Sequence, residues 1–521
     1  MKGFLSPKIY SSITLGGMGL FVTCSFLTDE PYLLMLTVAQ LVFIPVMLQM
    51  ILDIKKLHVF FIWLGMLSIV LLHVFTSDIG QLVFSSLYFI FTVFVALCGL
   101  YRFLNRGFVN WAEISIDIGM MYLFIGGGWL FIYQNGIDMG FSPLINWLTA
   151  IHFHYSAFLL PISIGLLGRM QMSRLYRWIV SFVIAGPLLV AIGITFWPFL
   201  EFFSVLLYIF AIYSLVYLAF KTRFPSLLQA LFVRLSYSAL SITILFSFLY
   251  AAGRAFGIWY VGIDFMLTFH GIFNCLLFGL LGLIGWAIKV PKSKQHGWSF
   301  PVSQIRGKLK VDDTYEQGLV EHLNVFVDTK VLPSTIIDFY EHTERYRLFS
   351  SVRWAAWFKP FLLIYKLFSV QMQQLNLPIS SKTTEMKGEI FAVDPLMDGR
   401  KNPRAWVRKV RQNTVFTAIY SYHENMGRTY MNIALPLPFS TMIGILQLNE
   451  INGSLVLSSE GEGDPGIYLA IGKMLFKLPL SEYFLIEEIR EGELTATHKM
   501  RLFGIPFLLI HYSIIRSEVA S

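Results

Sequence analysis

"GQLVFSSLYFIFTVFVALCGLY" (80–101) contains no charged side chain, and an α-helix of about 20 apolar residues is long enough to cross a bilayer. The whole chain has the same character. Of its 521 residues, 56% are hydrophobic and only 14% are charged, whereas an average soluble domain has about 25% charged residues. The mean hydropathy is +0.63. We therefore expect an integral membrane protein.

Comparable apolar windows recur up to about residue 289 and predict about ten transmembrane helices. The first window follows Lys2 and Lys8, as a signal peptide would, but no small-residue cleavage site follows it, so we interpret it as the first helix. The expected spans are 9–27, 31–51, 58–77, 80–101, 110–133, 144–167, 175–195, 199–220, 231–251 and 265–288.

The charges of the connections between these spans alternate along the chain. One set of connections is basic and carries Lys2, Lys8, Lys55, Lys56, Arg102, Arg106, Arg169, Arg174, Arg177, Lys221, Arg223, Arg234, Lys289, Lys292 and Lys294. The other set carries Asp29, Glu30, Asp78, Asp138, Glu201, Arg254 and Asp264, and only Arg254 departs from its acidic character. Because basic loops stay in the cytoplasm, the pattern predicts a cell-membrane protein with both termini cytoplasmic.

Charge and cysteine usage exclude several other classes. The net charge of +8 flanks the apolar segments, so it indicates membrane topology and lipid contact, and we expect no nucleic-acid partner. Cys24, Cys98 and Cys275 are far apart and lie in apolar runs without CxxC spacing. They predict neither a disulfide framework nor a zinc knuckle. The sequence identifies no protein partner.

The composition changes after Lys294, which predicts a transmembrane domain (1–290), a basic linker (291–312) and a cytosolic α+β domain (313–521). "PSTIIDFYEHTERYRLF" (333–349) has the start signal and period of a helix. "WAAWFKPFLLIYKLFSVQMQQLNLP" (354–378) is apolar, and its lysines suit a helix lying on the membrane surface or over a sheet better than another span.

From about residue 383 the apolar period shortens toward two, and turn signals such as "ENMG", "INGS" and "REGE" separate the segments. This pattern is typical of a meandering antiparallel sheet or open barrel. The expected strands are "EMKGEIFAVD", "AWVRKVRQ", "TVFTAIYSYHE", "RTYMNIALPLP", "GSLVLSSEG", "SEYFLIEEIREG", "ELTATHKMRLFG" and "IPFLLIHYSIIR".

Two apolar stretches, "AIHFHYSAFLLP" (150–161) and "TFHGIFNCLLFGLLGLIGW" (268–286), joined to this tail, resemble the YndJ-like family of bacterial multi-pass membrane proteins. The tail's closing pattern, "ELTATHKMRLFGIPFLLIHYSI" (493–514), is also similar to a family of small β-rich domains. The resemblance implies an architecture and no activity, so function must be argued from the residues.

"HFHY" (152–155) carries two histidines into an apolar span, where polar groups need partners. It resembles the stretch of haem–copper oxidases whose histidines ligate two haems. His152 and His154 are about 200° apart around a helix, so they cannot easily share one small site. The adjacent histidine pair of the oxidases is missing here. Haem is therefore disfavoured as a cofactor, while a metal ion stays open.

Other polar groups are expected at similar depth: Asp117 near the bilayer midplane, and His270 with Asn274 on one face of the last span. Intramembrane ionisable residues suggest function, since a carboxylate beside an imidazole can serve proton transfer or metal ligation. The structural alternative, a buried hydrogen bond between helices, has about equal weight. The catalytic candidates are His154, Asp117 and His270, and the substrate-binding candidates are His152, Asn274 and Tyr155.

Other features favour structural roles. Glu113 is expected to reach Arg106 or lipid headgroups, and Arg254 to anchor at headgroups. "GEGDPG" (461–466) is interpreted as a turn, because its acids would repel phosphate. The tail histidines lack a carboxylate or cysteine at ligand spacing and are expected to be surface or core residues; they are His423, His498 and His511.

Three classes of function remain open. The favoured one is a membrane-embedded enzyme or lipid-handling protein, with the polar cluster as its site and the tail as a hydrophobic-ligand or regulatory domain. The chain lacks the histidine boxes of di-iron desaturases. The alternatives are a proton-coupled transporter, although no internal repeat is evident, and a membrane-anchored scaffold or sensor.

Overall fold

The computed structural model divides the chain into two compact units. The first, called here the membrane unit, comprises Met1–Phe103 and Asn110–Gln295, and the second, called the barrel unit, comprises Leu104–Val109 and His296–Ser521. Each unit is described by itself. The structure describes residues 11–28, 30–258, 261–294, 298, 300–307, 309, 314–372, 374, 376–378, 381–410 and 413–517.

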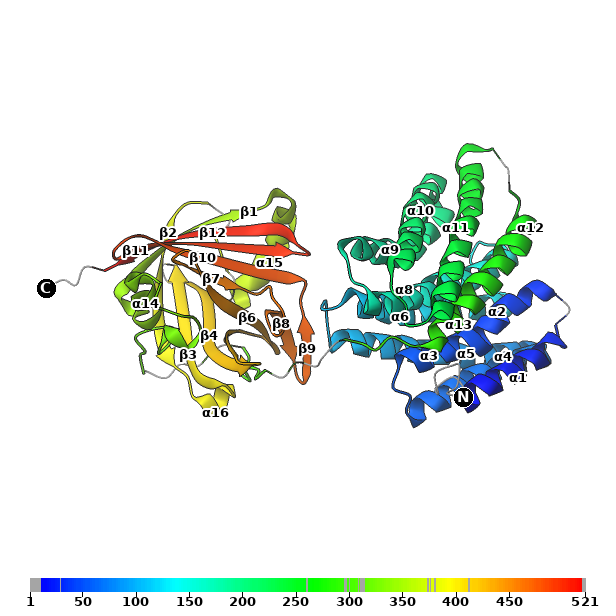
Figure 1. Ribbon diagram of the computed structural model, residues 1–521, viewed down its shortest axis with the longest axis horizontal. Helices are drawn as coiled ribbons and strands as arrows, with labels where there is room; N and C mark the ends of the chain where they lie inside the picture. Colours follow the sequence, from blue (N-terminus) through cyan, green and yellow to red (C-terminus); the bar gives the residue numbers. More distant parts are fainter. Residues whose placement is uncertain are drawn as a thin grey trace. The chain divides into compact units, whose positions relative to one another are not determined.

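The described part of the membrane unit contains nine helices that are long and apolar enough to cross a membrane (Figure 1). They are Pro31–Ile51 (containing α2, η3 and α3), α4 (Lys56–Val74), α5 (Asp78–Leu104), α6 (Trp111–Gln134), Pro143–Met170 (α7, η4 and α8), α9 (Arg174–Phe196), α10 (Pro198–Lys221), α11 (Leu227–Phe256) and Ile263–Ile288 (α12, η5, η6 and α13). The shorter helix α1, Ser12–Ser25, precedes them. The expected multi-pass helical domain is thus confirmed, and each expected span falls on one of these ten helices.

Three of the spans contain turns of π-helix, which often mark functional positions. They are η3 (Ala39–Phe43), η4 (Tyr155–Leu159), and the pair η5 (Met266–Gly271) and η6 (Asn274–Leu280). Pro45 and Pro161 stand in the first turn of the α-helix after η3 and η4. Because proline has no N–H to donate, the regular ladder of helical hydrogen bonds is interrupted there.

The described residues of the barrel unit form twelve antiparallel strands (Figure 1). They are β1 (Tyr346–Trp354), β2 (Thr384–Ala392), β3 (Lys401–Val410), β4 (Asn413–Asn425), β5 (Arg428–Leu437), β6 (Ser440–Ile451), β7 (Ser454–Ser458), β8 (Gly466–Ile471), β9 (Met474–Lys477), β10 (Leu480–Arg490), β11 (Glu493–Leu502) and β12 (Ile505–Arg516).

The strand pairings close into a ring. Neighbours run in the order β5-β4-β3-β2-β1-β12-β11-β10-β7-β6, and β6 pairs again with β5, while β8 and β9 extend from β6 outside the ring. The predicted β-rich antiparallel domain is therefore confirmed, as a closed barrel. The "INGS" turn joins β6 to β7 through Asn452 and Gly453, both with positive φ, as a tight hairpin requires.

Two parts of this unit differ from the expected pattern. The helix expected over 333–349 ends early, because α14 covers Ser334–Glu341 and β1 begins at Tyr346. Part of the expected linker packs against the barrel instead. Phe300 joins a cluster with Ile443 and Tyr468. This segment therefore covers the outer face of the β-sheet.

The core of the barrel unit lies inside the ring. Inward side chains such as Leu455, Leu494 and Ile510 are fully buried. The same cluster includes Ile336 and Phe339 of α14, which contacts β10 and β11 (Figure 1). α15 (Lys359–Met372) forms within the apolar segment expected to be helical.

Candidate functional site

Two arginines and two carboxylates meet inside the membrane unit. Arg102 on α5 donates to Asp117 over 2.8 Å and to Glu113 over 2.9 Å. Arg169 on α8 donates to both carboxylate oxygens of Glu113, at 2.7 and 3.0 Å. Glu113 and Asp117 are one turn apart on α6, so they share a face. These four residues are called the ion-pair cluster.

The ion-pair cluster also holds backbone from other helices. Arg102 donates to the carbonyl of Ile51 over 2.6 Å, and Arg169 to that of Pro291 over 3.0 Å. Both carboxylates are almost fully buried. Because an unpaired buried charge is very costly, the cluster ties together α3, α5, α6, α8 and the segment after α13. Both arginines had been interpreted only as loop charges.

His154 has a protein partner at each ring nitrogen. Its Nδ1 lies 2.8 Å from the carbonyl of Ala150, and its Nε2 lies 2.8 Å from the hydroxyl of Tyr88. A carbonyl can only accept, so Nδ1 carries the proton and Nε2 accepts from Tyr88. The ring is fully buried. Gly126 makes room for it, since a Cβ there would lie 2.7 Å from Nδ1.

The other candidates lie elsewhere in the membrane unit. Nδ1 of His270 faces the carbonyl of Thr243, its Nε2 lies 3.0 Å from the amide nitrogen of Asn274, and the amide oxygen of Asn274 accepts from the hydroxyl of Thr243. The hydroxyl of Tyr155 donates to the carbonyl of Met35 over 2.7 Å. His152 is exposed and contacts the carbonyl of Leu148.

The structure therefore joins His270 to Asn274, but the hydrogen bonds described here give Asp117 and His154 separate partners. Asp117 accepts a hydrogen bond from Arg102. Among the described residues, no group of three or more His, Cys, Asp or Glu side chains could hold a metal ion. The catalytic and substrate-binding roles assigned to these residues stay predictions.

Arg254 has a protein partner where a lipid headgroup was expected. It donates to Glu201 over 2.6 Å and to the carbonyl of Ile194 over 3.2 Å. Arg254 and Glu201 both belong to the set of loops that is expected to be acidic. The single positive charge that departed from the charge alternation is thus balanced within the protein.

A second polar cluster lies inside the barrel. The guanidinium of Arg408 on β3 lies 4.4 Å from the ring of Trp406 and 4.3 Å from that of Phe416. Tyr512 on β12 is close enough for a hydrogen bond with Arg408. His498 on β11 stacks on Phe484 at 3.8 Å. With Ser350 and Glu482, these are called the interior polar cluster.

Burial changes the acidity of this cluster. It raises the pKa of Glu482 to about 7, although the nearby Arg408 acts in the opposite direction. Burial, with a smaller contribution from the nearby Arg408, lowers the pKa of His498 to about 3. At neutral pH His498 is therefore neutral, while Glu482 is close to half protonated.

Replacing Glu482 by glutamine should make the barrel's stability less dependent on pH. The raised pKa means that folded Glu482 holds a proton that the unfolded chain releases, so its stabilising effect is complete below about pH 4.5 and is lost as the pH rises through about 7. Between pH 6 and pH 8, Glu482→Gln should gain about 1 kcal/mol relative to the wild type. Amide hydrogen exchange of β10 measures the stability of both proteins. A stability difference between variant and wild type that stays the same from pH 6 to pH 8 would contradict the prediction.

The remaining tail histidines are accounted for by the fold. His423 lies 3.1 Å from Asp464 and stacks on Phe300 and Tyr430. Asp464 belongs to the "GEGDPG" segment, which forms an irregular loop before β8. His511 is exposed. His498 is the one of the three that enters the barrel.

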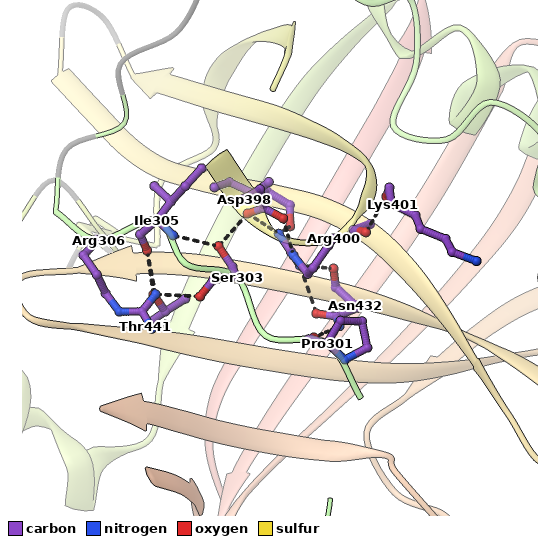
Figure 2. Close-up of polar contacts among 11 residues, drawn as sticks. Pro301, Ser303, Ile305, Arg306, Asp398, Arg400, Lys401, Asn432 and Thr441 are labelled. Atoms are coloured by element: carbon purple, nitrogen blue, oxygen red, sulfur yellow. Dashed lines mark hydrogen bonds and ion pairs between the residues drawn. The ribbon is translucent and has the colours of Figure 1, made fainter. Parts of the chain in front are cut away.

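Figure 2 shows a third polar group, in which Arg400 is saturated by partners. Its five contacts are two to Asp398, two to Asn432 and one to the carbonyl of Ile419. Asp398 also accepts from Ser303, at 2.6 Å. With every donor occupied, this group is a structural clamp between the strands and the segment around Ser303.

Arg408 and Glu482 are not predicted from the sequence, and His498 is predicted only to be a surface or core residue. One signal could have placed His498. In "ELTATHKM" the residues Leu494, Ala496, His498 and Met500 alternate with polar ones, which assigns His498 to the apolar face. No comparable signal marks Arg408, because apolar and charged residues occur on both faces of "AWVRKV".

Comparisons with known proteins agree with this architecture. The family model described as YndJ-like protein matches residues 34–278. The chain is 39% identical over 455 residues to the "Uncharacterized membrane protein YndJ" of Bacillus subtilis (strain 168), and the match covers 83% of each chain. No solved structure matches. A family model over most of the spans, together with a relative matched through most of both chains, shows that this multi-pass membrane protein belongs to the YndJ-like family.

Proposed function

We propose that this protein handles membrane lipids, and that its barrel receives the apolar chain of a lipid. The observation that carries the proposal is the closed ring of strands around an apolar interior that is exposed in one part. Phe484 and Tyr420 belong to the interior cluster and Glu482 lies on the same face as Phe484, yet all three are only partly buried. Solvent therefore reaches this part of the interior.

The size of the ring supports the binding of a lipid chain inside the barrel. Barrels of about eight strands already hold one small ligand, and larger rings enclose more space. Here the ring has ten strands, counted from the pairing order with β8 and β9 outside it. Its inward side chains are mainly Leu, Ile, Met and aromatic residues, which suit an acyl chain better than a polar metabolite.

α15 supports contact with a bilayer. Phe361 and Ile364 are about 60% exposed, and Trp357 precedes them on the turn before the helix with 41% exposure. Exposed apolar groups beside lysines such as Lys359 are typical of helices that lie in a lipid interface. We assign this face to the membrane surface, where the lipid would be exchanged.

The cellular arrangement belongs to the same proposal. The barrel lies on the cytoplasmic side of the cell membrane, with both ends of the chain in the cytoplasm. The alternation of basic and acidic loops supports this orientation.

Filling the interior should block the lipid. Ala496 faces inward on β11 and is almost fully buried, whereas Thr497 beside it faces outward. In nanodiscs of neutral lipid, photoreactive hexadecanol should label wild-type barrel peptides. Ala496→Trp should reduce this labelling at least tenfold, because the indole occupies the space of the chain.

Thr497→Trp is the matched control and should label like the wild type. Ala496→Phe should give an intermediate value if bulk is the cause. Equal labelling of all four proteins, or wild-type label confined to the outer surface of the barrel, contradicts lipid binding inside the barrel.

A further inference from the structure

We propose that Arg408 forms the receptor for an anionic lipid headgroup inside the barrel, assisted by Ser350, Tyr512 and His498. The ligand is a single apolar chain ending in a carboxylate or a phosphate monoester. This inference rests on the proposed function and adds the identity of the headgroup. It is carried by buried polar atoms that have no partner.

Arg408 is a buried cation with an open donor. Only 9% of the residue is exposed, yet its Nε has no hydrogen-bond partner among the described residues. Arg408 makes no close ion pair with a described residue, although its charge acts on the pKa of the nearby Glu482. Trp406 and Phe416 contact the guanidinium through their rings, which positions it without occupying Nε. A buried guanidinium with an open N–H is costly unless an acceptor joins it.

A second buried arginine in the barrel unit, Arg400, has a structural role and provides a comparison. Arg400 is even more enclosed, since its side chain is completely buried, and its donors meet Asp398, Asn432 and a backbone carbonyl (Figure 2). Burial alone therefore does not explain the open Nε–H of Arg408. The difference between the two arginines indicates that the acceptor of Arg408 comes from outside the chain.

Other open polar groups lie in the interior. Nε2 of His498 and Oγ of Ser350 are buried and have no hydrogen-bond partner in the described part of the chain. Ser350 on β1 is directly opposite Tyr512 on β12, and Tyr512 is within hydrogen-bond reach of Arg408. A headgroup at Arg408 would thus meet hydroxyl donors from two neighbouring strands.

The charges around the site favour one anion. The ionisable side chains that face Arg408 are Glu482 on β10, His498 on β11, Tyr420 on β4 and Tyr512 on β12. Only Glu482 among them carries negative charge near neutrality. In its protonated form it can donate a hydrogen bond to the headgroup, and in its ionised form it would repel it.

The test uses the full chain in nanodiscs of neutral lipid, with photoreactive palmitic acid as the probe. Arg408→Gln should reduce labelling of barrel peptides at least tenfold, while labelling by photoreactive hexadecanol stays within twofold. Arg408→Lys should keep part of the palmitate labelling, because it retains the charge but loses the planar fork. Lys409→Gln removes the neighbouring outward charge and should label like the wild type.

Competition with unlabelled compounds identifies the headgroup. Palmitate displacing the probe better than hexadecyl phosphate assigns a carboxylate, and the reverse order assigns a phosphate monoester. Palmitate labelling that is unchanged in Arg408→Gln overturns the inference but leaves the proposed function standing. Absence of interior labelling by either probe in the wild type overturns both. Retained hexadecanol labelling shows that the variant barrel is folded.

Discussion

Replacing Glu113 by glutamine should prevent the membrane unit from folding stably. Glu113 is the carboxylate that both Arg102 and Arg169 contact, and it is 2% exposed. Removing one partner from a buried ion pair typically costs about 3–5 kcal/mol, because the remaining charge is left buried without compensation. We expect little monodisperse protein after detergent extraction, and a clearly lower thermal midpoint in what is recovered.

Glu201→Gln is the matched control for this variant. It removes the carboxylate partner of Arg254, whose side chain is 26% exposed and can reach water or headgroups. Its effect should be smaller than that of Glu113→Gln. The double variant Glu113→Gln with Arg169→Gln should recover part of the loss, because one buried cation leaves with the anion. A Glu113→Gln midpoint equal to the wild type would show that the cluster does not hold the helices together.

The second large effect is expected in the barrel unit, where Asp398→Asn should open the clamp around Arg400. The two side chains are completely buried and only 2.6 Å apart. Asparagine cannot neutralise the guanidinium, so we expect a loss of about 3–5 kcal/mol. Hydrogen exchange in β3 and β5 should rise strongly, since Asn432 is bound to Arg400.

Glu493→Gln provides the comparison. Its partner Arg490 is 79% exposed, and exposed ion pairs contribute about 0–1 kcal/mol. Exchange in the same strands should therefore stay near the wild-type rate. If amide hydrogen exchange in β3 is equally slow in the Asp398→Asn and Glu493→Gln variants, the clamp is not a major source of stability.

The spans could be predicted from sequence because each is set by local composition. A run such as Asp78–Leu104 must be a helix in lipid, whatever its neighbours are, since only a helix satisfies its backbone internally. The positions of Arg102 and Arg169 could not be obtained this way. Counting loop charges assigns a side of the membrane, but not the contact with Glu113, which depends on how α5, α6 and α8 pack.

The barrel shows the same division between local and long-range information. Alternating runs and turns predict most strands, but the helix predicted over 333–349 overlaps the start of β1. The sequence does not indicate this strand, because "RYRLFSSVRW" (345–354) gains its extended form from pairing with β12 and β2. The inward orientation of Arg408 is equally non-local. It depends on the register of β3 with β4, where Arg408 lies opposite Phe416.

The seam between β1 and β12 governs when the barrel can assemble. Its outermost pair, Tyr346 with Arg516, joins positions that are 170 residues apart in the sequence. β2 holds β1 through only three residue pairs. Closing so long a loop carries a large entropic cost and slows folding. While β12 is being synthesised, β1 has an open edge and the apolar interior is uncovered. This is the period when the chain is most exposed to aggregation.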